Sequence, residues 1–268
     1  MYKNQRRIKE LTPYIPAVDI FRIYEREPGA AFLDSSLVNE LGHYSVIGRC
    51  PYLKLVKDGE NFTINGRPET ETTFEDYMRE YLNTHEDKNN SGLPIVSGAV
   101  GYFSYDYIKY SEPKLKLGEH EDPDFRDMDL MLFDQVIAFD HYRQKVLLIT
   151  GVMLDDLENS YQKAEKKLQE MADLIRNAQK AEFLPLQLDS EIKPQFPKEK
   201  YCQMVEKAKH YIHEGDIFQV VLSNPMRAKA EGSLFDTYRV LRATNPSPYM
   251  FYFSSDDIEL AGASPETL

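Results

Sequence analysis

The sequence predicts an α+β fold, in which strand-rich and helical segments occupy different stretches of the chain. Most of residues 1–150 consists of short apolar runs separated by turn signals. Two of these signals, Asp58-Gly59 and Asn65-Gly66, are dipeptides that favour tight turns between paired strands. A long amphipathic helix follows, and further helices and strands then alternate as far as Leu268.

The strands predicted in the first part are apolar runs bounded by turn residues. They are Ala30–Leu33, Tyr44–Ile47, Tyr52–Lys57, Phe62–Ile64, Ile95–Tyr105, Leu130–Phe139 and Val146–Thr150. One helix interrupts them, because Thr73 and Asp76 resemble a capping box in front of an apolar pattern.

The clearest helical pattern spans Leu154–Lys180, where apolar residues recur every three or four positions. Acidic residues lie at its start and basic residues at its end, as the helix dipole favours. The face expected to be buried consists of Leu157, Tyr161, Ala164, Leu168, Met171 and Ile175. We interpret this segment as a helix that covers a sheet, with a partner-binding helix as the alternative.

Three prolines and the lack of a hydrophobic period mark residues 183–197 as a linker. The chain is therefore divided into a region 1–182, this linker and a region 198–268. The elements predicted after the linker are helix, strand, helix and hairpin, at Lys198–Glu214, Ile217–Leu222, Ser233–Arg242, Tyr249–Phe253 and Ile258–Ala263. Gly215 is expected to cap the first of these helices. Because the sequence stops after an apolar strand, we expect the rest of a sheet to follow Leu268.

Composition excludes several classes of partner. The net charge is −12 and Lys and Arg form no basic stripe, which argues against nucleic acid and against an anionic membrane surface. No apolar run approaches the ~20 residues of a membrane helix, and the basic N-terminus lacks an apolar signal core. Cys50 and Cys202 form no metal-ligand or disulfide pattern. We therefore expect a cytoplasmic protein.

Residue spacing alone identifies no catalytic centre. The segment Gly98–Gly101 lacks the third glycine and the following helix of a dinucleotide-binding loop. The histidines show no convincing set of zinc ligands, and neither Ser223 nor Ser264 has an identifiable base. These patterns predict an acidic globular protein that is at most an enzyme candidate.

Five motifs, however, follow one another in order along nearly the whole chain. They are Phe32-Leu33-Asp34-Ser35 with Gly42-His43-Tyr44-Ser45, Gly98–Asp106, Gly215–Val221, Asn245–Tyr252 and Gly262–Glu266. In residues and spacing this set resembles the chorismate-utilising enzymes, and most closely the large subunits (component I) of anthranilate synthase. The resemblance implies that family's fold, in which mixed and antiparallel sheets pack face to face with helices outside, here incomplete.

The resemblance also implies an activity and a set of functional residues. The family's large subunit is a lyase of tryptophan biosynthesis that adds ammonia to Mg²⁺-bound chorismate and releases pyruvate and anthranilate. A glutamine amidotransferase subunit (component II) supplies the ammonia. L-Tryptophan inhibits the enzyme at positions that match Ser35, Pro248, Tyr249 and Met250, and an acid that would protonate the departing ring hydroxyl matches Glu266. The family's Mg²⁺ ligands and catalytic histidine follow Leu268, so this chain alone is expected to be inactive.

Some positions differ from the family pattern. Asp34 stands where glutamate is usual, and His43 replaces a frequent arginine, which removes a permanent charge. Asn224 begins a segment where a basic residue is common. Two alternatives stay open: aminodeoxychorismate synthase component I of the folate pathway, and a fragment that only binds tryptophan as a regulatory module.

Overall fold

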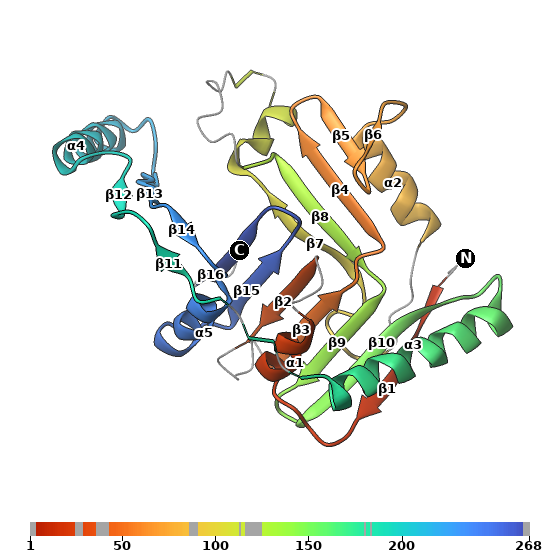
Figure 1. The fold of residues 1–268 in the computed structure, drawn as a ribbon. Coiled ribbons are helices and arrows are strands. Elements are labelled where there is room, and N and C mark those ends of the chain that lie inside the picture. Colours follow the sequence, from red (N-terminus) through yellow and green to blue (C-terminus); the bar gives the residue numbers. More distant parts are fainter. Residues whose placement is uncertain are drawn as a thin grey trace. The chain divides into compact units, whose positions relative to one another are not determined.

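The computed structural model describes residues 4–24, 29–35, 43–85, 91–112, 114–115, 125–179, 181–182 and 184–264. The chain divides into two compact units, one formed by Met1–Glu182 with Tyr238–Leu268 and the other by Phe183–Thr237 (Figure 1). The division into regions 1–182, 183–197 and 198–268 that the sequence predicts stays a prediction.

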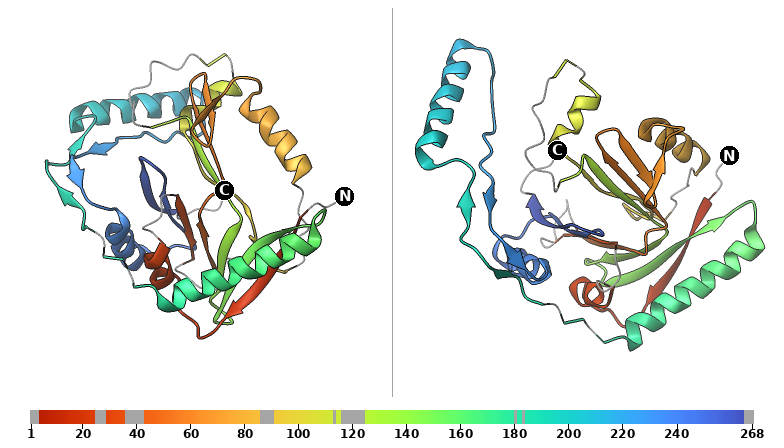
Figure 2. Two further views of the ribbon diagram at one scale, coloured as in Figure 1. Left: turned by 45° about the vertical axis from the view of Figure 1, so that its right-hand side comes forward. Right: turned by 45° about the horizontal axis from the view of Figure 1, so that its top comes forward.

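A seven-stranded sheet forms the larger part of the first unit. In spatial order its strands are β1 (Asn4–Leu11), β10 (Lys145–Met153), β9 (Gln135–Asp140), β3 (Tyr44–Arg49), β2 (Ala30–Asp34), β15 (Tyr249–Ser254) and β16 (Glu259–Ser264). Every neighbouring pair is antiparallel. The hairpin β15–β16 therefore completes a sheet whose other strands lie in the first 153 residues, and it stays beside β2 in both views of Figure 2.

A five-stranded antiparallel sheet forms the second layer of this unit. Its strands, in spatial order, are β6 (Arg67–Glu69), β5 (Asn61–Ile64), β4 (Leu53–Asp58), β8 (Met128–Phe133) and β7 (Gly98–Phe103). The two predicted turns join β4 to β5 and β5 to β6, and Gly59, Asn65 and Gly66 all have positive φ angles there. Glycine and asparagine adopt this left-handed conformation at low cost, which explains why these turns were predictable.

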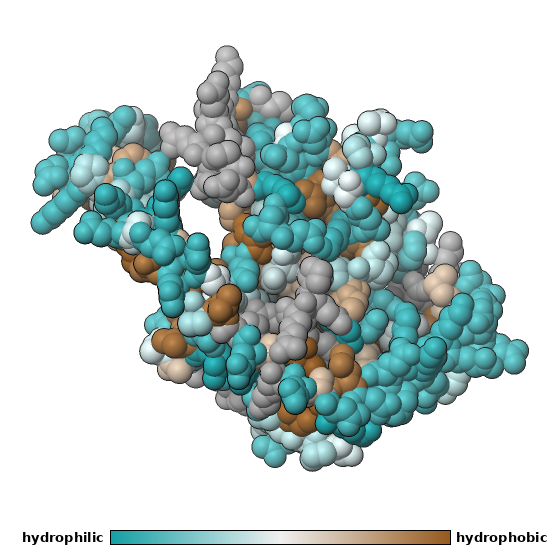
Figure 3. Space-filling view, in the orientation of Figure 1, coloured by the Kyte–Doolittle hydropathy of each residue, from teal (hydrophilic) through white to brown (hydrophobic). Residues whose placement is uncertain are grey.

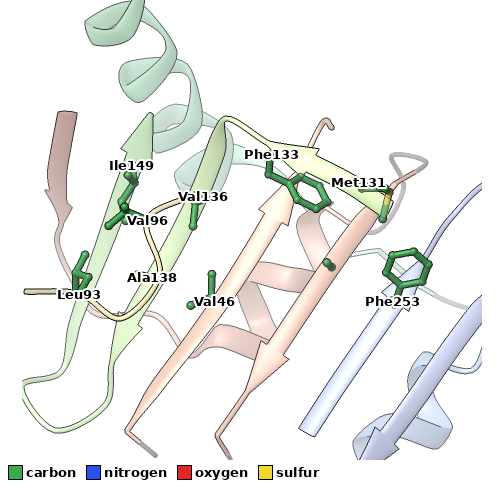
Figure 4. Close-up of a cluster of buried hydrophobic side chains, with 10 residues drawn as sticks. Val46, Leu93, Val96, Met131, Phe133, Val136, Ala138, Ile149 and Phe253 are labelled. Carbon is green, nitrogen blue, oxygen red and sulfur yellow. The ribbon is translucent and has the colours of Figure 1, made fainter. Parts of the chain in front are cut away.

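The two sheets share a buried hydrophobic core (Figure 4). Alternate residues of the seven-stranded sheet face this core, while Met131 and Phe133 reach it from β8 of the five-stranded sheet. The seven-stranded sheet and the segment before β7 contribute the remaining buried residues, which are Ala31, Val46, Val136, Ala138, Ile149, Phe253, Leu93 and Val96. The α+β fold with packed antiparallel sheets is thus confirmed.

Helices cover the outer faces of both sheets. Helices α1 (Ala17–Tyr24) and α3 (Leu157–Asn177) pack on the seven-stranded sheet, where Phe21 stacks on Phe32 with ring centroids 5.2 Å apart. The 3-10 helix η1 (Tyr105–Tyr110) follows β7, and α2 (Phe74–Thr84) packs on the five-stranded sheet through Phe74. The opposite face of α3 is hydrophilic (lower right in Figure 3). Within the described ranges, no helix is both long enough and apolar enough to cross a membrane.

The second unit consists of α4 (Lys198–Glu214) and two short ladders. Strand β11 (Gln187–Leu188) pairs with β14 (Ala230–Glu231), and β12 (Lys193–Pro194) pairs with β13 (Met226–Arg227). Gly215 ends α4 with a φ of 81°, as its predicted role as a C-cap requires. Helix α5 (Phe235–Thr244) begins in this unit and continues into the first.

Several local features were predicted wrongly or were missed. The predicted strand Ile217–Leu222 is irregular, and Phe218 is fully exposed, because no described strand pairs with this apolar run. Asp134 divides the single strand expected at Leu130–Phe139 into β8 and β9 of different sheets. Strand β1 and helix α1 were not predicted at all. On α3, Leu157 and Tyr161 lie outside the buried face, with exposures of 54% and 41%.

The packing of α3 can be tested by shortening a buried and an exposed leucine on the same helix. Leu168 is fully buried, so Leu168→Ala should lower the free energy of unfolding by about 2–5 kcal/mol through lost contacts and a residual cavity. Leu157→Ala, at the exposed end, should change it by less than about 0.5 kcal/mol. Urea unfolding at equilibrium measures both, and equal losses would contradict the orientation of α3.

Candidate functional site

The pairing of β2 with β15 brings distant parts of the chain together. Met250 lies opposite Asp34 in this ladder, so Ser35, which directly follows β2, reaches the residue that precedes β15. The Ser35 hydroxyl donates a hydrogen bond of 2.9 Å to the carbonyl oxygen of Pro248, 213 positions away in sequence. The structure thus places Ser35 beside the segment Pro248–Met250.

The turn before β15 is held by a second serine. The Ser247 hydroxyl accepts a hydrogen bond of 3.0 Å from the Tyr249 amide and donates one to the carbonyl oxygen of Ser264. Ser264 is the last residue of β16 and the register partner of Tyr249. Ser247 is only 5% exposed, so these bonds are shielded from water and fix the turn to both strands of the hairpin.

A cavity of about 720 Å³ lies beside this contact. Such a volume is typical of pockets that hold small molecules. Its walls are largely apolar and are formed by the two strand ends, by the start of β3 and by the segment before β7. The residues lining it are Leu33, Asp34, Ser35, His43, Tyr44, Val46, Gly92, Leu93, Pro94, Ile95, Pro248, Tyr249, Met250, Phe251 and Ser264. All four residues expected to contact tryptophan line this one cavity.

A buried carboxylate lies behind the cavity. The side chain of Asp34 has no exposed surface, and it accepts hydrogen bonds from Arg242 Nε at 2.5 Å and the Tyr238 hydroxyl at 3.0 Å. The Ser45 hydroxyl approaches its other oxygen at 2.5 Å. A buried charge of this kind is tolerated only when it is paired and hydrogen-bonded. Through these hydrogen bonds Asp34 connects α5 with strands β2 and β3.

The hydrogen-bond partners of Ser45 determine which atoms carry the protons between Asp34 and His141. Ser45 Oγ accepts a hydrogen bond from the Ser35 amide at 3.2 Å and must give its only proton to the Asp34 carboxylate. His141 Nε2 lies 2.6 Å from Ser45 Oγ and so must carry a proton and donate it. The Tyr14 hydroxyl lies 3.1 Å from His141 Nδ1 and can donate to or accept from this nitrogen. The contacts therefore fit a neutral imidazole that carries its proton on Nε2 and accepts from Tyr14 at Nδ1.

The electrostatic environment agrees with this assignment. Burial lowers the pKa of His141 and outweighs the attraction of Asp34, which acts in the opposite sense. Burial raises the pKa values of Tyr14 and Tyr238, with the negative charge of Asp34 adding to both effects. Neutral phenols and a neutral imidazole thus surround the Asp34–Arg242 ion pair.

Two parts of the expected active site are not placed. Glu266 lies outside the described residues, which end at Ser264, the last residue of β16. No group of three or more His, Cys, Asp or Glu side chains that could hold a metal ion occurs in the described part of the chain. The described residues therefore offer no ligand cluster that fits Mg²⁺. The supporting roles of Ser45 and His141 have no signal in the sequence and become evident only from their contacts.

Comparison with known proteins decides the family. A sequence model described as chorismate binding enzyme matches residues 42–268. The chain belongs to this family. Among its curated relatives, anthranilate synthase component 1 of Acetivibrio thermocellus is 33% identical over 94% of this chain and 53% of its own length. The same component of Saccharomyces cerevisiae is 32% identical over 97% of this chain and 52% of its own length.

Solved structures agree with this membership in the chorismate binding enzyme family. Anthranilate synthase component I of Streptococcus pneumoniae superposes with a TM-score of 0.67 at 29% identity, over 86% of this chain and 52% of that one. The menaquinone-specific isochorismate synthase of Escherichia coli gives a TM-score of 0.58 at 14% identity, which shows a shared fold alone. The chain spans about half the length of the relatives it matches.

The neutral state of His141 predicts how stability depends on pH. Since its pKa is depressed by folding, the unfolded chain binds the proton more tightly, and stability falls as pH drops below the ordinary histidine value of 6.5. His141→Gln, which cannot titrate, should weaken this dependence in thermal unfolding curves recorded between neutral pH and about pH 5. His213→Gln, on the exposed side of α4, should leave it unchanged. An unaltered pH profile in the His141 variant would contradict the assignment.

Proposed function

We propose that this chain is the N-terminal portion of an anthranilate synthase large subunit. The whole enzyme would convert chorismate, with ammonia drawn from glutamine by an amidotransferase subunit, to anthranilate and pyruvate in the cytoplasm. Membership in the chorismate binding enzyme family and the names of the similar component 1 proteins support this proposal. Mg²⁺ would bind through residues that follow Leu268, so the present chain should have no activity by itself.

We further propose that the cavity beside Ser35 binds tryptophan as a feedback inhibitor. The observation that carries this proposal is the Ser35–Pro248 hydrogen bond at the rim of an apolar cavity. Leu33, Ile95 and Phe251 offer apolar surface for an indole, and the sulfur of Met250 suits contact with an aromatic ring. The Ser35 hydroxyl and backbone carbonyls supply acceptors for an ammonium group.

Occupancy of this cavity would be coupled to catalysis through β15 and β16. Met250 pairs with Asp34 on one side and with Ala263 on the other, and the proposed catalytic acid Glu266 follows shortly after. A ligand that tightens this ladder would change the position of Glu266, where a carboxylic acid would protonate the departing ring hydroxyl. Allosteric coupling of this kind typically amounts to about 1–3 kcal/mol.

Calorimetry with L-tryptophan on this chain tests the inhibitor site. We expect saturable heat from the wild-type chain and none from Ser35→Arg, because the larger cationic side chain fills the cavity and repels the ammonium group. Ser111→Arg adds the same side chain at an exposed turn away from the cavity and should bind normally. Absence of heat from the wild-type chain at millimolar tryptophan would refute the site.

The reaction is tested on a protein that carries this chain together with the remaining family residues. Chorismate, ammonium and Mg²⁺ should yield fluorescent anthranilate, and Glu266→Gln should lower kcat by roughly 100-fold or more if Glu266 is the general acid. Formation of 4-amino-4-deoxychorismate would instead identify the folate-pathway enzyme. If the protein bound tryptophan but converted no chorismate, the remaining interpretation would be a regulatory module that only binds tryptophan.

A further inference from the structure

A second cavity, of about 540 Å³, lies in the first unit and shares no lining residue with the one beside Ser35. Helices α2 and α3, both on the right-hand side of this unit in Figure 1, contribute two of its walls. Strands β1, β7 and β10 and the junction of β8 with β9 provide the rest. The proposed activity and the tryptophan site make no use of this cavity.

One wall of this second cavity is aromatic and apolar. The rings of Tyr81 and His85 stack in parallel with centroids 4.0 Å apart, and the hydroxyls of Tyr81 and Tyr52 are hydrogen-bonded to each other. Met78, Leu82, Leu132 and Met153 line the cavity beside them. Thioether and ring surfaces together suit the face or edge of a planar aromatic ligand.

A second group of lining residues is cationic. Three positively charged side chains (Arg6, Lys163 and Lys167) line the cavity against two carboxylates (Asp134 and Asp156). This excess of positive charge is notable because the chain as a whole carries a net charge of −12. A concave site with a local positive potential attracts anions.

The carboxylate of Asp134, in this cationic group, already has hydrogen-bond donors from the protein. Asp134 accepts hydrogen bonds from Lys167 at 2.8 Å, Arg6 at 3.2 Å and the Gly151 amide at 2.8 Å. Burial would raise the pKa of Asp134, but Lys167 and the other donors outweigh it and hold this pKa below its usual value. Asp134 therefore stays ionised and orients its partners.

Lys163 is the cation that this arrangement leaves available. It lies one helical turn from Lys167 on α3, it is exposed, and it makes no ion pair with any residue in the described ranges. Asp156, the other carboxylate, accepts a hydrogen bond from Asn159 at 2.8 Å. An ammonium group at the mouth of an aromatic pocket can bind a carboxylate without displacing an existing partner.

We propose that this second cavity binds a small planar aromatic carboxylate. The ring would lie against Tyr81, Met78 and Leu82, and the carboxylate would face Lys163 at the mouth. The ligand would bind non-covalently as a monoanion, and the proposal involves no chemical step.

Benzoate is the probe, and the half-buried thiol of Cys50, which lines this cavity, is the reporter. In a Cys202→Ser background, Cys50 is the only thiol, and mass spectrometry follows its reaction with methyl methanethiosulfonate. Benzoate should slow this reaction in a saturable manner, whereas benzamide, its neutral analogue, and sodium chloride at the same ionic strength should not. Amide chemical-shift changes at Gly98 and Gly151, which also line the cavity, give a second readout.

Variants at exposed positions distinguish the contribution of the Lys163 charge to benzoate binding from the contribution of the apolar wall. Lys163→Gln should raise the half-protecting benzoate concentration about threefold, as expected for loss of one exposed ion pair. Lys166→Gln, on the same helix but outside the cavity, should leave it unchanged. Leu82→Glu places a carboxylate on the apolar wall and should abolish protection. Thermal unfolding of each variant verifies its fold.

Three outcomes would overturn the proposal. They are equal protection by benzamide and benzoate, equal effects of the Lys163 and Lys166 variants, and the absence of both thiol protection and chemical-shift changes. Ser35→Arg should leave benzoate protection intact, so failure at the tryptophan site and failure at the second cavity are distinguishable.

Discussion

Backbone hydrogen bonding between β2 and β15 joins parts of the chain that are more than 200 residues apart, and the candidate inhibitor site depends on it. This ladder sets Met250 opposite Asp34, and from that register follow both the Ser35–Pro248 contact and the wall of the cavity. A slip of one residue would turn every side chain of β15 to the other face of the sheet. The register is therefore held from both faces, by Phe253 in the core between the sheets and by Tyr252 against Phe21.

The polar network behind the cavity also stabilises the pairing register of β2 with β15. Asp34 binds Arg242 on α5, while Ser45 links Asp34 to His141 on the other side. Loss of one partner from a buried ion pair is costly, so this network favours a single arrangement of β2, β3 and α5. The tip of the β15–β16 hairpin is held in addition by ion pairs from Asp256 to Lys54 and from Asp257 to Arg126. The hairpin thus connects the cavity with both sheets of the first unit.

Sequence patterns predicted the features that depend on neighbouring residues. The turns at Gly59 and Asn65, the Thr73 cap and the Gly215 cap all follow from local backbone preferences. Features set by distant partners were missed. Strand β1 is rich in polar and charged residues and shows no apolar run, and it is a strand because it pairs with β10. The apolar run Ile217–Leu222 has no described strand to pair with. Likewise, the family motifs brought Ser35 and Met250 to attention, but no local signal connects Ser45 with His141.

A crystal structure of this chain with bound L-tryptophan tests the central claim most directly. We expect the indole to lie between Leu33, Ile95 and Met250, with the ammonium group beside Ser35 and with Met250 still paired to Asp34. Tryptophan bound elsewhere, or a structure in which Ser35 and Pro248 are far apart with no cavity between them, would contradict the account.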